Sequence, residues 1–336
     1  MKKKPNKLPK VTFIMLTLNV EGILPKSIGA IRSQNYPQEL IEIIIADGGS
    51  KDKTVEIAKA ANAKIIFNPS TYHEGGKVLA LKLAKGKIAF FTDSDNVLSN
   101  PNWVSSMVKA YLENPSIKGL LAQTIPAPDS NSFDRYLGYL ATDPFTWFVY
   151  QKAASARTYD NLYSIVRSTP DYIVYQFDPT NHPLVGHAQG FGVITPYKKT
   201  SLDDIIPIIN MISKGGLIAY VPNAGVYHYH IKKISDFIKK YTWKINNNLS
   251  KKIKGIGLTE RQNYLTPERK MRQFLFPLYS LSIIFPLKDS LGLFFRYKDP
   301  VVFWHPFACI LLSSLILKEG FLYLIGMGKE MGKYGK

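Results

Sequence analysis

The chain has 336 residues and 46% hydrophobic content, which is enough for one large domain or two with apolar cores. Lysine and arginine outnumber aspartate and glutamate by 43 to 25, so the net charge is +18. This excess suits nucleic acid, an anionic membrane surface or a phosphate-bearing substrate, but the sequence contains no zinc-finger spacing, RNA-binding signature or basic leucine zipper. Cys309 is the single cysteine, which excludes a disulfide framework and a cysteine metal site and favours a reducing compartment.

The first third of the chain alternates between short apolar runs and segments with helical spacing. The runs predict strands over 11–18, 41–46, 63–67 and 88–92, and the spacing predicts helices over 22–35, 53–61, 76–84 and 103–113. This alternation is typical of an α/β fold with an open parallel sheet and helices on both faces. Ligands of such sheets bind beyond the carboxyl ends of the strands. Asn19, Asp47 and Asp93 all follow strand ends, so we expect them to share one site.

The pattern is less regular from about 126 to 200, and most of that region has no predicted element. Further along, the sequence predicts a helix over 203–213, strands over 217–221 and 225–229, and a basic helix over 234–249. The segment from His228 to Arg272 contains twelve basic and three acidic residues. Its net charge of +9 is half of the net charge of the chain, +18. Basic residues that flank apolar segments favour a membrane interface over a nucleic-acid groove.

Two apolar segments, 274–287 and 301–317, come last. Each is shorter than the ~20 apolar residues that a spanning helix needs, and each is interrupted by proline. We therefore expect re-entrant or in-plane helices, although 301–317 could cross together with 321–327 if Lys318 and Glu319 were tolerated. An ordinary helical core or an oligomer contact is the alternative. The basic N-terminus, 1–10, is followed by no apolar stretch of the secretory type, so we expect the catalytic part to stay in the cytoplasm.

Asp93 and Asp95 directly follow the predicted strand over 88–92. At a strand end, this spacing lets both carboxylates reach one point beyond the sheet edge. Oxygen ligands suit a divalent cation such as Mg²⁺ or Mn²⁺, which can also bind a diphosphate. The chemistry that this suggests is the departure of a nucleoside diphosphate, whose growing charge the metal neutralises.

Four pieces of the sequence, in the right order, resemble family 2 glycosyltransferases of the GT-A fold, over roughly residues 11–230. They are Thr17-Leu-Asn-Val-Glu21, Asp47-Gly-Gly-Ser-Lys-Asp-Lys-Thr54, Thr92-Asp-Ser-Asp-Asn96, and Asp203-Asp204 followed by Gly215-Gly216 and Tyr220-Val-Pro222. The tail echoes membrane-associated members of the family. The resemblance implies a nucleotide-sugar-binding half over 1–125, an acceptor-binding and catalytic half over 126–230, and a membrane-associating tail over 231–336.

The resemblance also implies roles for single residues. Asp47 would contact the nucleobase, or alternatively bond the backbone of its own turn, and Gly49 would permit that turn. Thr17, Asn19 and Glu21 would line the nucleotide pocket, although Glu21 could equally start the following helix. Lys77 would hold the diphosphate as a point charge, unless it is a solvated helix residue.

Asp204 would be the general base of an inverting transfer, since attack opposite the leaving diphosphate needs a carboxylate to take the proton of the hydroxyl. Asp203 is the second catalytic candidate, and its expected role is to orient the loop that carries Asp204. His228 would complete a metal site with Asp93 and Asp95, and His230 is its competitor. His187 and Gln189 match the acceptor loop of the family only loosely, because the arginine usual after that loop is missing and 194–197 reads Ile-Thr-Pro-Tyr.

These observations predict an inverting, metal-dependent glycosyltransferase that uses a nucleoside-diphosphate sugar and a sugar or lipid-linked acceptor at the cytoplasmic face of an anionic membrane, with no nucleic-acid partner. Three rivals remain. The glycine-rich N-terminal loop of a sugar nucleotidyltransferase is absent, and a processive polysaccharide synthase would need a Gln-x-x-Arg-Trp motif, of which only Trp243 is present. A catalytically inactive adaptor would be expected to lose acids at 47, 93, 95 or 204, and all four are intact.

Overall fold

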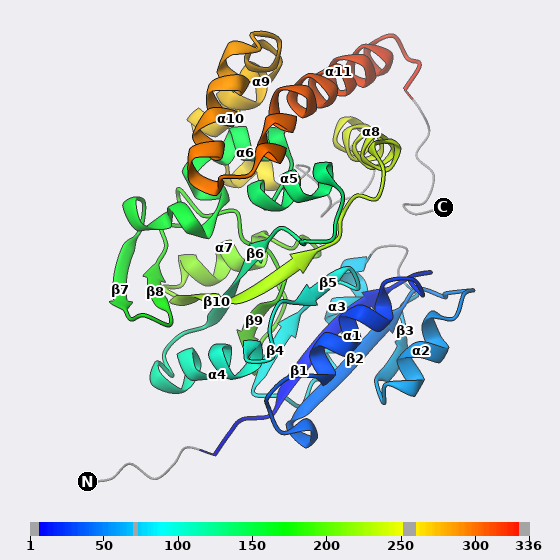
Figure 1. The fold of residues 1–336 in the computed structure, drawn as a ribbon, viewed down its shortest axis with the longest axis vertical. Helices are drawn as coiled ribbons and strands as arrows, with labels where there is room; N and C mark the ends of the chain where they lie inside the picture. Colours follow the sequence, from blue (N-terminus) through cyan, green and yellow to red (C-terminus); the bar gives the residue numbers. More distant parts are fainter. Residues whose placement is uncertain (1–6, 70–72, 251–259, 329–336) are drawn as a thin grey trace. The chain divides into compact units, whose positions relative to one another are not determined.

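The computed structural model describes residues 7–69, 73–250 and 260–328. The chain forms two compact units (Figure 1). The first comprises residues 1–124 and 160–228, and the second comprises residues 125–159 and 229–336. The second unit therefore combines a segment from the middle of the chain with the C-terminal helices. The division that the resemblance implies, with boundaries near residues 125 and 230, stays a prediction.

The first unit is built on one mixed sheet, in which the described residues form strands in the order β3-β2-β1-β4-β9-β6-β10-β8-β7, with β5 paired to β10. The strands are β1 (Val11–Thr17), β2 (Ile41–Asp47), β3 (Lys64–Phe67), β4 (Ile88–Phe91), β5 (Asn96–Leu98), β6 (Gly119–Ile125), β7 (Ser164–Ser168), β8 (Ile173–Gln176), β9 (Phe191–Ile194) and β10 (Ile218–His228). Strands β3, β2, β1 and β4 are parallel, as predicted. The prediction of a parallel sheet is wrong beyond them, since β9 is antiparallel to β4 and to β6, and β10 is antiparallel to β5 and β8.

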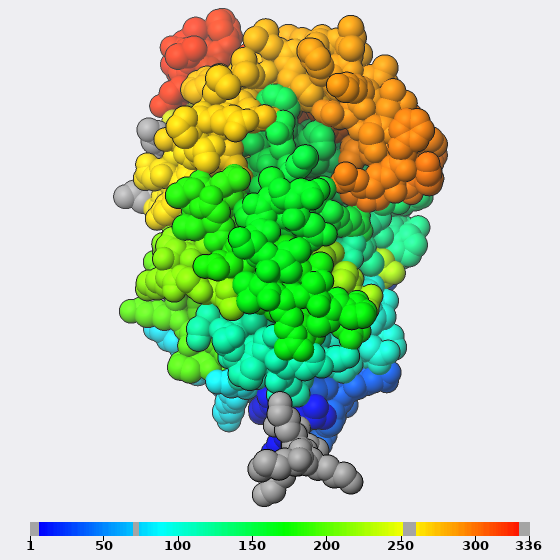
Figure 2. Space-filling view, turned by 90° about the vertical axis from the view of Figure 1, so that its left-hand side faces the viewer, coloured from blue at the N-terminus to red at the C-terminus, as the bar shows by residue number. Residues whose placement is uncertain are grey.

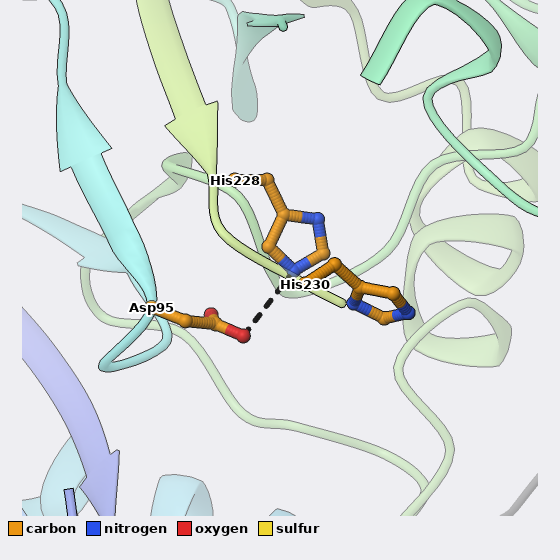
Figure 3. A group of neighbouring side chains, drawn as sticks. All are labelled: Asp95, His228 and His230. Carbon is orange, nitrogen blue, oxygen red and sulfur yellow. Dashed lines mark ion pairs between the residues drawn. The ribbon is translucent and has the colours of Figure 1, made fainter. Parts of the chain in front are cut away.

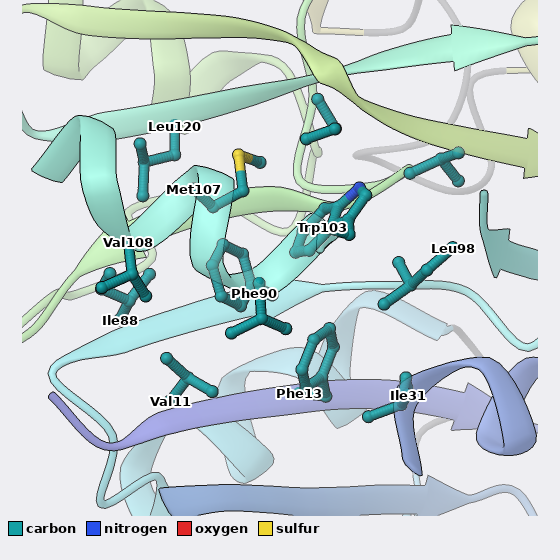
Figure 4. Packing of buried hydrophobic residues seen from close by; sticks show 14 of the residues in the cluster. Val11, Phe13, Ile31, Ile88, Phe90, Leu98, Trp103, Met107, Val108 and Leu120 are labelled. Carbon is teal, nitrogen blue, oxygen red and sulfur yellow. The ribbon is translucent and has the colours of Figure 1, made fainter. Parts of the chain in front are cut away.

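Helices cover both faces of this sheet. The first unit contains α1 (Leu24–Arg32), α2 (Thr54–Ala60), α3 (His73–Leu83), α4 (Trp103–Glu113) and α7 (Ile206–Ser213). Helices α1 and α4 pack on the face that carries Phe13 and Phe90, where the ring of Trp103 lies 4.9 Å from that of Phe90 (Figure 4). Helix α3 approaches the other face so closely that a Cβ on Gly76 would come within 3.0 Å of Ala46. This close approach carries Lys77 to the carboxyl end of the sheet.

The predicted elements of the first 113 residues are confirmed within a few residues at each end, and α4 has the predicted bounds. Two predictions further along are wrong in detail. The predicted strands over 217–221 and 225–229 are one continuous strand, β10, although Pro222 lies inside it. The helix predicted over 203–213 begins only at Ile206, because Asp203 bonds the first backbone N–H groups.

The second unit is helical and has its own apolar core. Its α-helices within the described residues are α5 (Ser132–Leu140), α6 (Pro144–Tyr150), α8 (Ile234–Ser250), α9 (Pro267–Leu281), α10 (Ile284–Tyr297) and α11 (Trp304–Leu324). The predicted basic helix is confirmed as α8, and part of the basic run, 251–259, lies outside the described residues. Phe237, Phe276 and Leu312 are buried together in the core of this unit.

The apolar tail forms longer helices than the sequence predicts. Helix α11 runs through Lys318 and Glu319, because the Glu319 side chain is buried and accepts a hydrogen bond of 2.8 Å from Asn246 on α8. The segment Pro300–Leu324 is by length and composition long enough to cross a membrane, a property that core helices of soluble proteins share. Helices α9 and α10 pass the same test only as a pair that is bent by 93°.

Candidate active site

The carboxyl ends of β1, β2 and β4 meet at one edge of the sheet. Thr17 and Asp47 are directly paired in the parallel register of β1 and β2, and β4 lies on the other side of β1. Asp93 follows the end of β4 by two residues. The prediction that these positions fall at one edge is therefore confirmed, because parallel neighbours share the direction in which they end.

Asp47 organises the loop that follows β2. Its Oδ1 accepts hydrogen bonds from the hydroxyls of Thr17 (2.8 Å) and Ser50 (2.6 Å), and its Oδ2 accepts from the backbone N–H groups of Gly49 (2.9 Å) and Ser50 (2.8 Å). A carboxylate offers about four lone-pair sites, so these four bonds fill them. Gly49 has a φ of 90°, which a residue with a side chain rarely adopts. Asp47 thus bonds its own turn, and its contact with a nucleobase stays a prediction.

Asn19 and Glu21 connect the loop after β1 to the loop after β2. The Asn19 Oδ1 accepts from the N–H of Lys51 at 2.8 Å, and the Glu21 Oε2 accepts from the N–H of Lys53 at 2.9 Å. Both side chains are exposed, and the backbone of Asn19 is left-handed with a φ of 52°. These bonds fix the two loops against each other, and the roles of both residues in a nucleotide pocket stay predictions.

The turn that carries Asp93 and Asp95 is held by Asn96, a residue to which the sequence analysis gave no role. The Asn96 Oδ1 accepts from the N–H of Asp93 at 3.1 Å, and its Nδ2 donates to the Asp95 Oδ1 at 3.1 Å. Asn96 is 2% exposed, whereas the two aspartate side chains are 35% and 33% exposed. The amide therefore lies beneath the turn and leaves both carboxylates accessible.

His228, the last residue of β10, lies beside Asp95. Strand β10 pairs with β5 so that His228 is opposite Asn96, and the His228 Nε2 lies 3.5 Å from the Asp95 Oδ2 (Figure 3). The other ring nitrogen, Nδ1, is 3.2 Å from the Nε2 of Gln189, whose Oε1 accepts from Thr124 at 2.9 Å. His230, also drawn in Figure 3, belongs to the second unit, where the ammonium of Lys240 lies 2.9 Å from its Nε2.

Lys77 is buried at the centre of a charge cluster, with only 3% of the residue exposed. Its ammonium donates to the Glu74 Oε1 at 2.7 Å and to the backbone oxygen of His187 at 2.6 Å, and it lies 3.7 Å from the Asp93 Oδ1. Burial alone would lower the pKa of Lys77, but the charges of Asp93, Glu74 and Asp204 raise it above its ordinary value. The alternative reading of Lys77 as a solvated helix residue is therefore wrong.

Partial removal of water from its carboxylate by the surrounding protein raises the pKa of Asp93 above its ordinary value. The ammonium of Lys77 and the ring of His228 oppose this shift, whereas the neighbouring carboxylates Asp95 and Glu74 add to it. Three carboxylates close to one another thus disfavour the ionised form of Asp93. A bound cation would relieve that repulsion, and two carboxylates with one imidazole are a donor set that divalent metals accept.

Lys199 and Glu74 extend this cluster to the loop of Asp203 and Asp204. The ammonium of Lys199 lies 3.0 Å from the Glu74 Oε2 and donates to the backbone oxygens of Ser201, at 2.8 Å, and Asp203. Its side chain is fully buried, and burial, the first cause, lowers its pKa despite the attraction of Glu74. Sequence reasoning missed both residues, because only the helical spacing of Glu74 and Lys77 links either to the predicted site.

Asp203 and Asp204 have different environments. The Asp203 carboxylate is fully buried, and its Oδ1 accepts from the N–H groups of Ile205 (2.6 Å) and Ile206 (2.9 Å), which begin α7. The Asp204 carboxylate faces Gly186, where an added Cβ would lie 2.9 Å from its Oδ2. Asp203 thus holds the loop, and Asp204 is the half-buried acid of the pair.

His187 is buried on the inner side of this loop. Its Nε2 lies 3.0 Å from the hydroxyl of Tyr197, and its backbone N–H donates to the backbone oxygen of Asp204 at 2.9 Å. Burial, together with the charges of Lys199 and Lys77, lowers the pKa of His187 well below its ordinary value, so the ring is neutral near pH 7. These contacts make His187 a support for the loop.

Replacing Lys77 by Met should destabilise the first unit by about 3–5 kcal/mol, because Glu74 and Asp93 would lose the buried cation between them. Urea unfolding would measure the change. Lys82→Met, at an exposed position of the same helix, is the matched control and should stay within about 0.5 kcal/mol of the wild type. Equal stability of the two variants would contradict the buried ion cluster.

Comparisons with known proteins agree with this geometry. Residues 12–168 match the family described as glycosyl transferase family 2. The O-antigen chain rhamnosyltransferase RfbN of Salmonella typhimurium is 26% identical over 236 residues, which are 66% of this chain and 67% of that protein. The glucosyl-3-phosphoglycerate synthase of Petrotoga mobilis is 33% identical over 119 residues, 32% of this chain and only 36% of that protein.

A solved structure of similar fold is that of the mannosyltransferase PcManGT from Pyrobaculum calidifontis, in complex with GDP-Man and Mn²⁺. The TM-score is 0.50 with 14% sequence identity, and the match covers 94% of this chain and 91% of the other. Together with the family match, this likeness confirms the predicted GT-A fold class.

Proposed function

Because residues 12–168 of this chain match glycosyl transferase family 2, we propose that it moves a sugar from a nucleoside-diphosphate donor to an acceptor hydroxyl with inversion. The observation that carries this proposal is the buried Lys77. It contacts the metal-motif acid Asp93 directly, and its pKa is raised by Asp93 and by Asp204. The acids assigned to the leaving group and to the nucleophile therefore belong to one electrostatic cluster.

A divalent cation fits the residues at the end of β4. Asp93 and Asp95 would hold it through carboxylate oxygens, and His228 would hold it through Nε2, on the side that already faces Asp95 at 3.5 Å. When bound, such an ion stabilises the negative charge that develops on a leaving diphosphate. With Nε2 on the ion, the His228 Nδ1 would carry the ring proton, and the Gln189 amide would turn its oxygen toward it to accept the bond.

The protein side of the reaction follows from the same cluster. The acceptor hydroxyl gives its proton to the Asp204 carboxylate while its oxygen attacks the anomeric carbon of the donor sugar. The bond from that carbon to the diphosphate oxygen breaks, and the diphosphate leaves with the electron pair. Lys77 lies beside Asp93 and supplies a permanent positive charge to the leaving group. Attack from the face opposite to the diphosphate inverts the anomeric centre.

The nucleotide would lie over the loops after β1 and β2. Thr17, Asp47 and Gly49 form the inner part of this surface, and Asn19 and Glu21 form its outer rim. The acceptor proposed is a lipid-linked sugar or phosphate at the cytoplasmic face of the membrane. Its support is the exposed apolar surface of helices α9 to α11, with lysine and arginine beside it, and the likeness to a protein of O-antigen chain synthesis.

A thermal-shift panel of UDP-, GDP- and dTDP-sugars, each with Mn²⁺ and with EDTA, tests this function. One nucleotide class should raise the unfolding temperature, and only with Mn²⁺, because a ligand present at about a hundred times its Kd adds about 2.7 kcal/mol of stability. A panel with no response to any nucleotide would favour a catalytically inactive adaptor of the same fold. A response that is unchanged by EDTA would contradict the metal site.

A further inference from the structure

We propose that helices α9 and α10 form a re-entrant hairpin that inserts into one leaflet of a membrane, with the turn at Ser282 and Ile283 at its deepest point. Helix α9 ends at Leu281, α10 begins at Ile284, and the two helices are bent by 93° relative to each other. The amber and orange atoms of this region lie at the surface that Figure 2 shows. This proposal concerns how the second unit binds lipid and is independent of the sugar chemistry proposed above.

The hairpin has two apolar faces, and only one of them is covered by its own unit. Phe276 and Tyr279 of α9 point into the core of the second unit. The opposite face is open and apolar, with Phe274 82% exposed and Ile284 74% exposed. Further apolar side chains on this open face are Met271, Leu278, Leu281, Ile283, Phe285, Leu287, Leu291 and Phe295. Exposed apolar side chains that gather on one helix pair mark a surface that contacts lipid or another protein.

The distribution of charge favours lipid as the occupant. The stretch from Gln273 to Leu287 contains no charged residue, while Lys270 and Arg272 precede it and Lys288 follows it. Two cations thus precede the stretch, and the one that follows it stands before Asp289, whose carboxylate is bonded to Tyr279 within the unit, so that the cations suit an anionic headgroup layer. A protein partner would give no reason for cations at both ends and none between them.

The length of the hairpin matches one leaflet and not a whole bilayer. From Gln273 to Leu281 the helix rises about 13 Å at ~1.5 Å per residue. The hydrocarbon core of a bilayer is about 30 Å thick, so a helix of this length stays within one leaflet of about 15 Å. Since the chain turns by 93°, α10 returns toward the layer from which α9 entered when both helices are inclined by about 45°, which places the turn roughly 9 Å below that layer.

The backbone N–H groups of the turn already have partners, as hydrocarbon requires. The N–H of Ser282 donates to the Leu278 oxygen at 3.1 Å, and the N–H groups of Ile283 and Ile284 donate to the oxygens of Ser280 and Ser282. The hydroxyls of Ser280 and Ser282 donate to backbone oxygens of α9 at 2.8 and 2.6 Å. These groups therefore enter the membrane without losing bonds to water.

The residue at the bend is itself informative. Ile283 has a φ of 58°, a conformation in which glycine is the usual residue and a β-branched side chain is strained. In water this position combines backbone strain with a side chain that is 53% exposed. Insertion into lipid accounts for an isoleucine here, because the apolar side chain then lies in hydrocarbon.

A polar network fixes the covered side of the hairpin to the rest of the unit. The hydroxyl of Tyr279 on α9 donates to the Asp289 Oδ2 on α10 at 2.7 Å and lies 2.9 Å from the His305 Nε2 on α11. The other nitrogen of His305 is 2.7 Å from the Tyr136 hydroxyl on α5. Four helices are thus joined on the covered side, which leaves the open side rigid and available.

Flotation of the full-length chain with vesicles of phosphatidylcholine and phosphatidylglycerol tests the hairpin. The wild type should float with the vesicles even at high salt, which screens the basic residues but not insertion. The double variant Phe274→Asp/Ile284→Asp should bind at least about a hundredfold more weakly, because two large apolar side chains are lost from the inserted face. Ile165→Asp/Val166→Asp, at exposed apolar positions of β7, is the matched control and should float like the wild type.

Two further measurements separate insertion from other occupants of this face. Ile283→Gly relieves the strained backbone, so its unfolding temperature in solution should not fall while its vesicle binding does. A fluorophore at Ile284→Cys should be quenched by lipid brominated deep in the chains, and one at Lys288→Cys by lipid brominated near the headgroup; Cys309 is buried and stays unlabelled. The proposal would be overturned if the wild type did not float with the vesicles. It would also be overturned if brominated lipid did not quench the label at position 284 and the chain formed a stable dimer in solution.

Discussion

Replacing Asp93 by Asn should lower sugar transfer on the order of a thousandfold while the chain still folds. The amide keeps the size of the side chain but removes the charge that would bind a cation beside Lys77 and Asp95. Metal stabilisation of a leaving group contributes several kcal/mol, and each 1.36 kcal/mol is about tenfold in rate. The assay is release of nucleoside diphosphate from the donor that the thermal-shift panel identifies. Asp171→Asn, at an exposed aspartate of the same unit, is the matched control.

The stability of this variant provides a readout that is independent of activity. Because burial and neighbouring carboxylates raise the pKa of Asp93, its ionised form is less favourable in the folded state than in the unfolded state. Above that raised pKa, the charge therefore costs stability, and the amide removes the cost. The metal-free variant should unfold at an equal or higher temperature than the metal-free wild type at neutral pH. Mn²⁺ should then stabilise the wild type and leave the variant unchanged.

The same shift sets the direction of the pH dependence. As the pH falls from neutral through the raised pKa of Asp93, the carboxylate takes up a proton and loses its affinity for a cation. Mn²⁺ binding, measured from the electron paramagnetic resonance signal of free Mn²⁺, should weaken on acidification in the wild type. A variant Asp93→Asn with full transfer activity and wild-type Mn²⁺ affinity would refute the assignment of the metal site.

The parts of the fold that sequence reasoning predicted are those that local patterns determine. The strands β1 to β4 are continuous apolar runs, and their parallel pairing places Asp47 and Asp93 at one edge whatever follows them. The pair Asp93 and Asp95 is found from the sequence because two carboxylates directly after a strand are chemically specific. The antiparallel half of the sheet was not predicted, since the pairing of β9 with β4 joins residues about a hundred positions apart.

The missed site residues share a physical reason. Lys199 and Glu74 are 125 positions apart, and as a lysine and a glutamate they are typical of a solvated surface. Only their burial beside Lys77 shows that they join helix α3 to the loop of Asp203. Gln189 was named as a loose match to the acceptor loop, but its contact with His228 was not predicted, because that contact depends on pairing across the sheet and on a left-handed backbone with a φ of 52°. Neither property leaves a pattern in the neighbouring sequence.

Asp204→Asn and Asp203→Asn should differ sharply, although the two residues are neighbours. A positioned general base contributes about 10²- to 10⁴-fold to a rate, so Asp204→Asn should lower transfer by that factor while donor and Mn²⁺ binding stay unchanged. Asn at position 203 keeps an Oδ1 that accepts from the N–H groups of Ile205 and Ile206, so that variant should retain most activity.

Asp203→Ala completes this comparison. It removes the acceptor at the start of α7 and should lower the stability of the chain by about 1 kcal/mol without affecting the proton transfer itself. Transfer of labelled sugar to the lipid fraction and urea unfolding measure the two effects separately. If Asp204→Asn were as active as Asp203→Asn, a group other than Asp204 would have to take the proton of the acceptor hydroxyl. The buried, neutral ring of His187 and the cations Lys77 and Lys199 offer no equivalent carboxylate, which is why the prediction rests on Asp204.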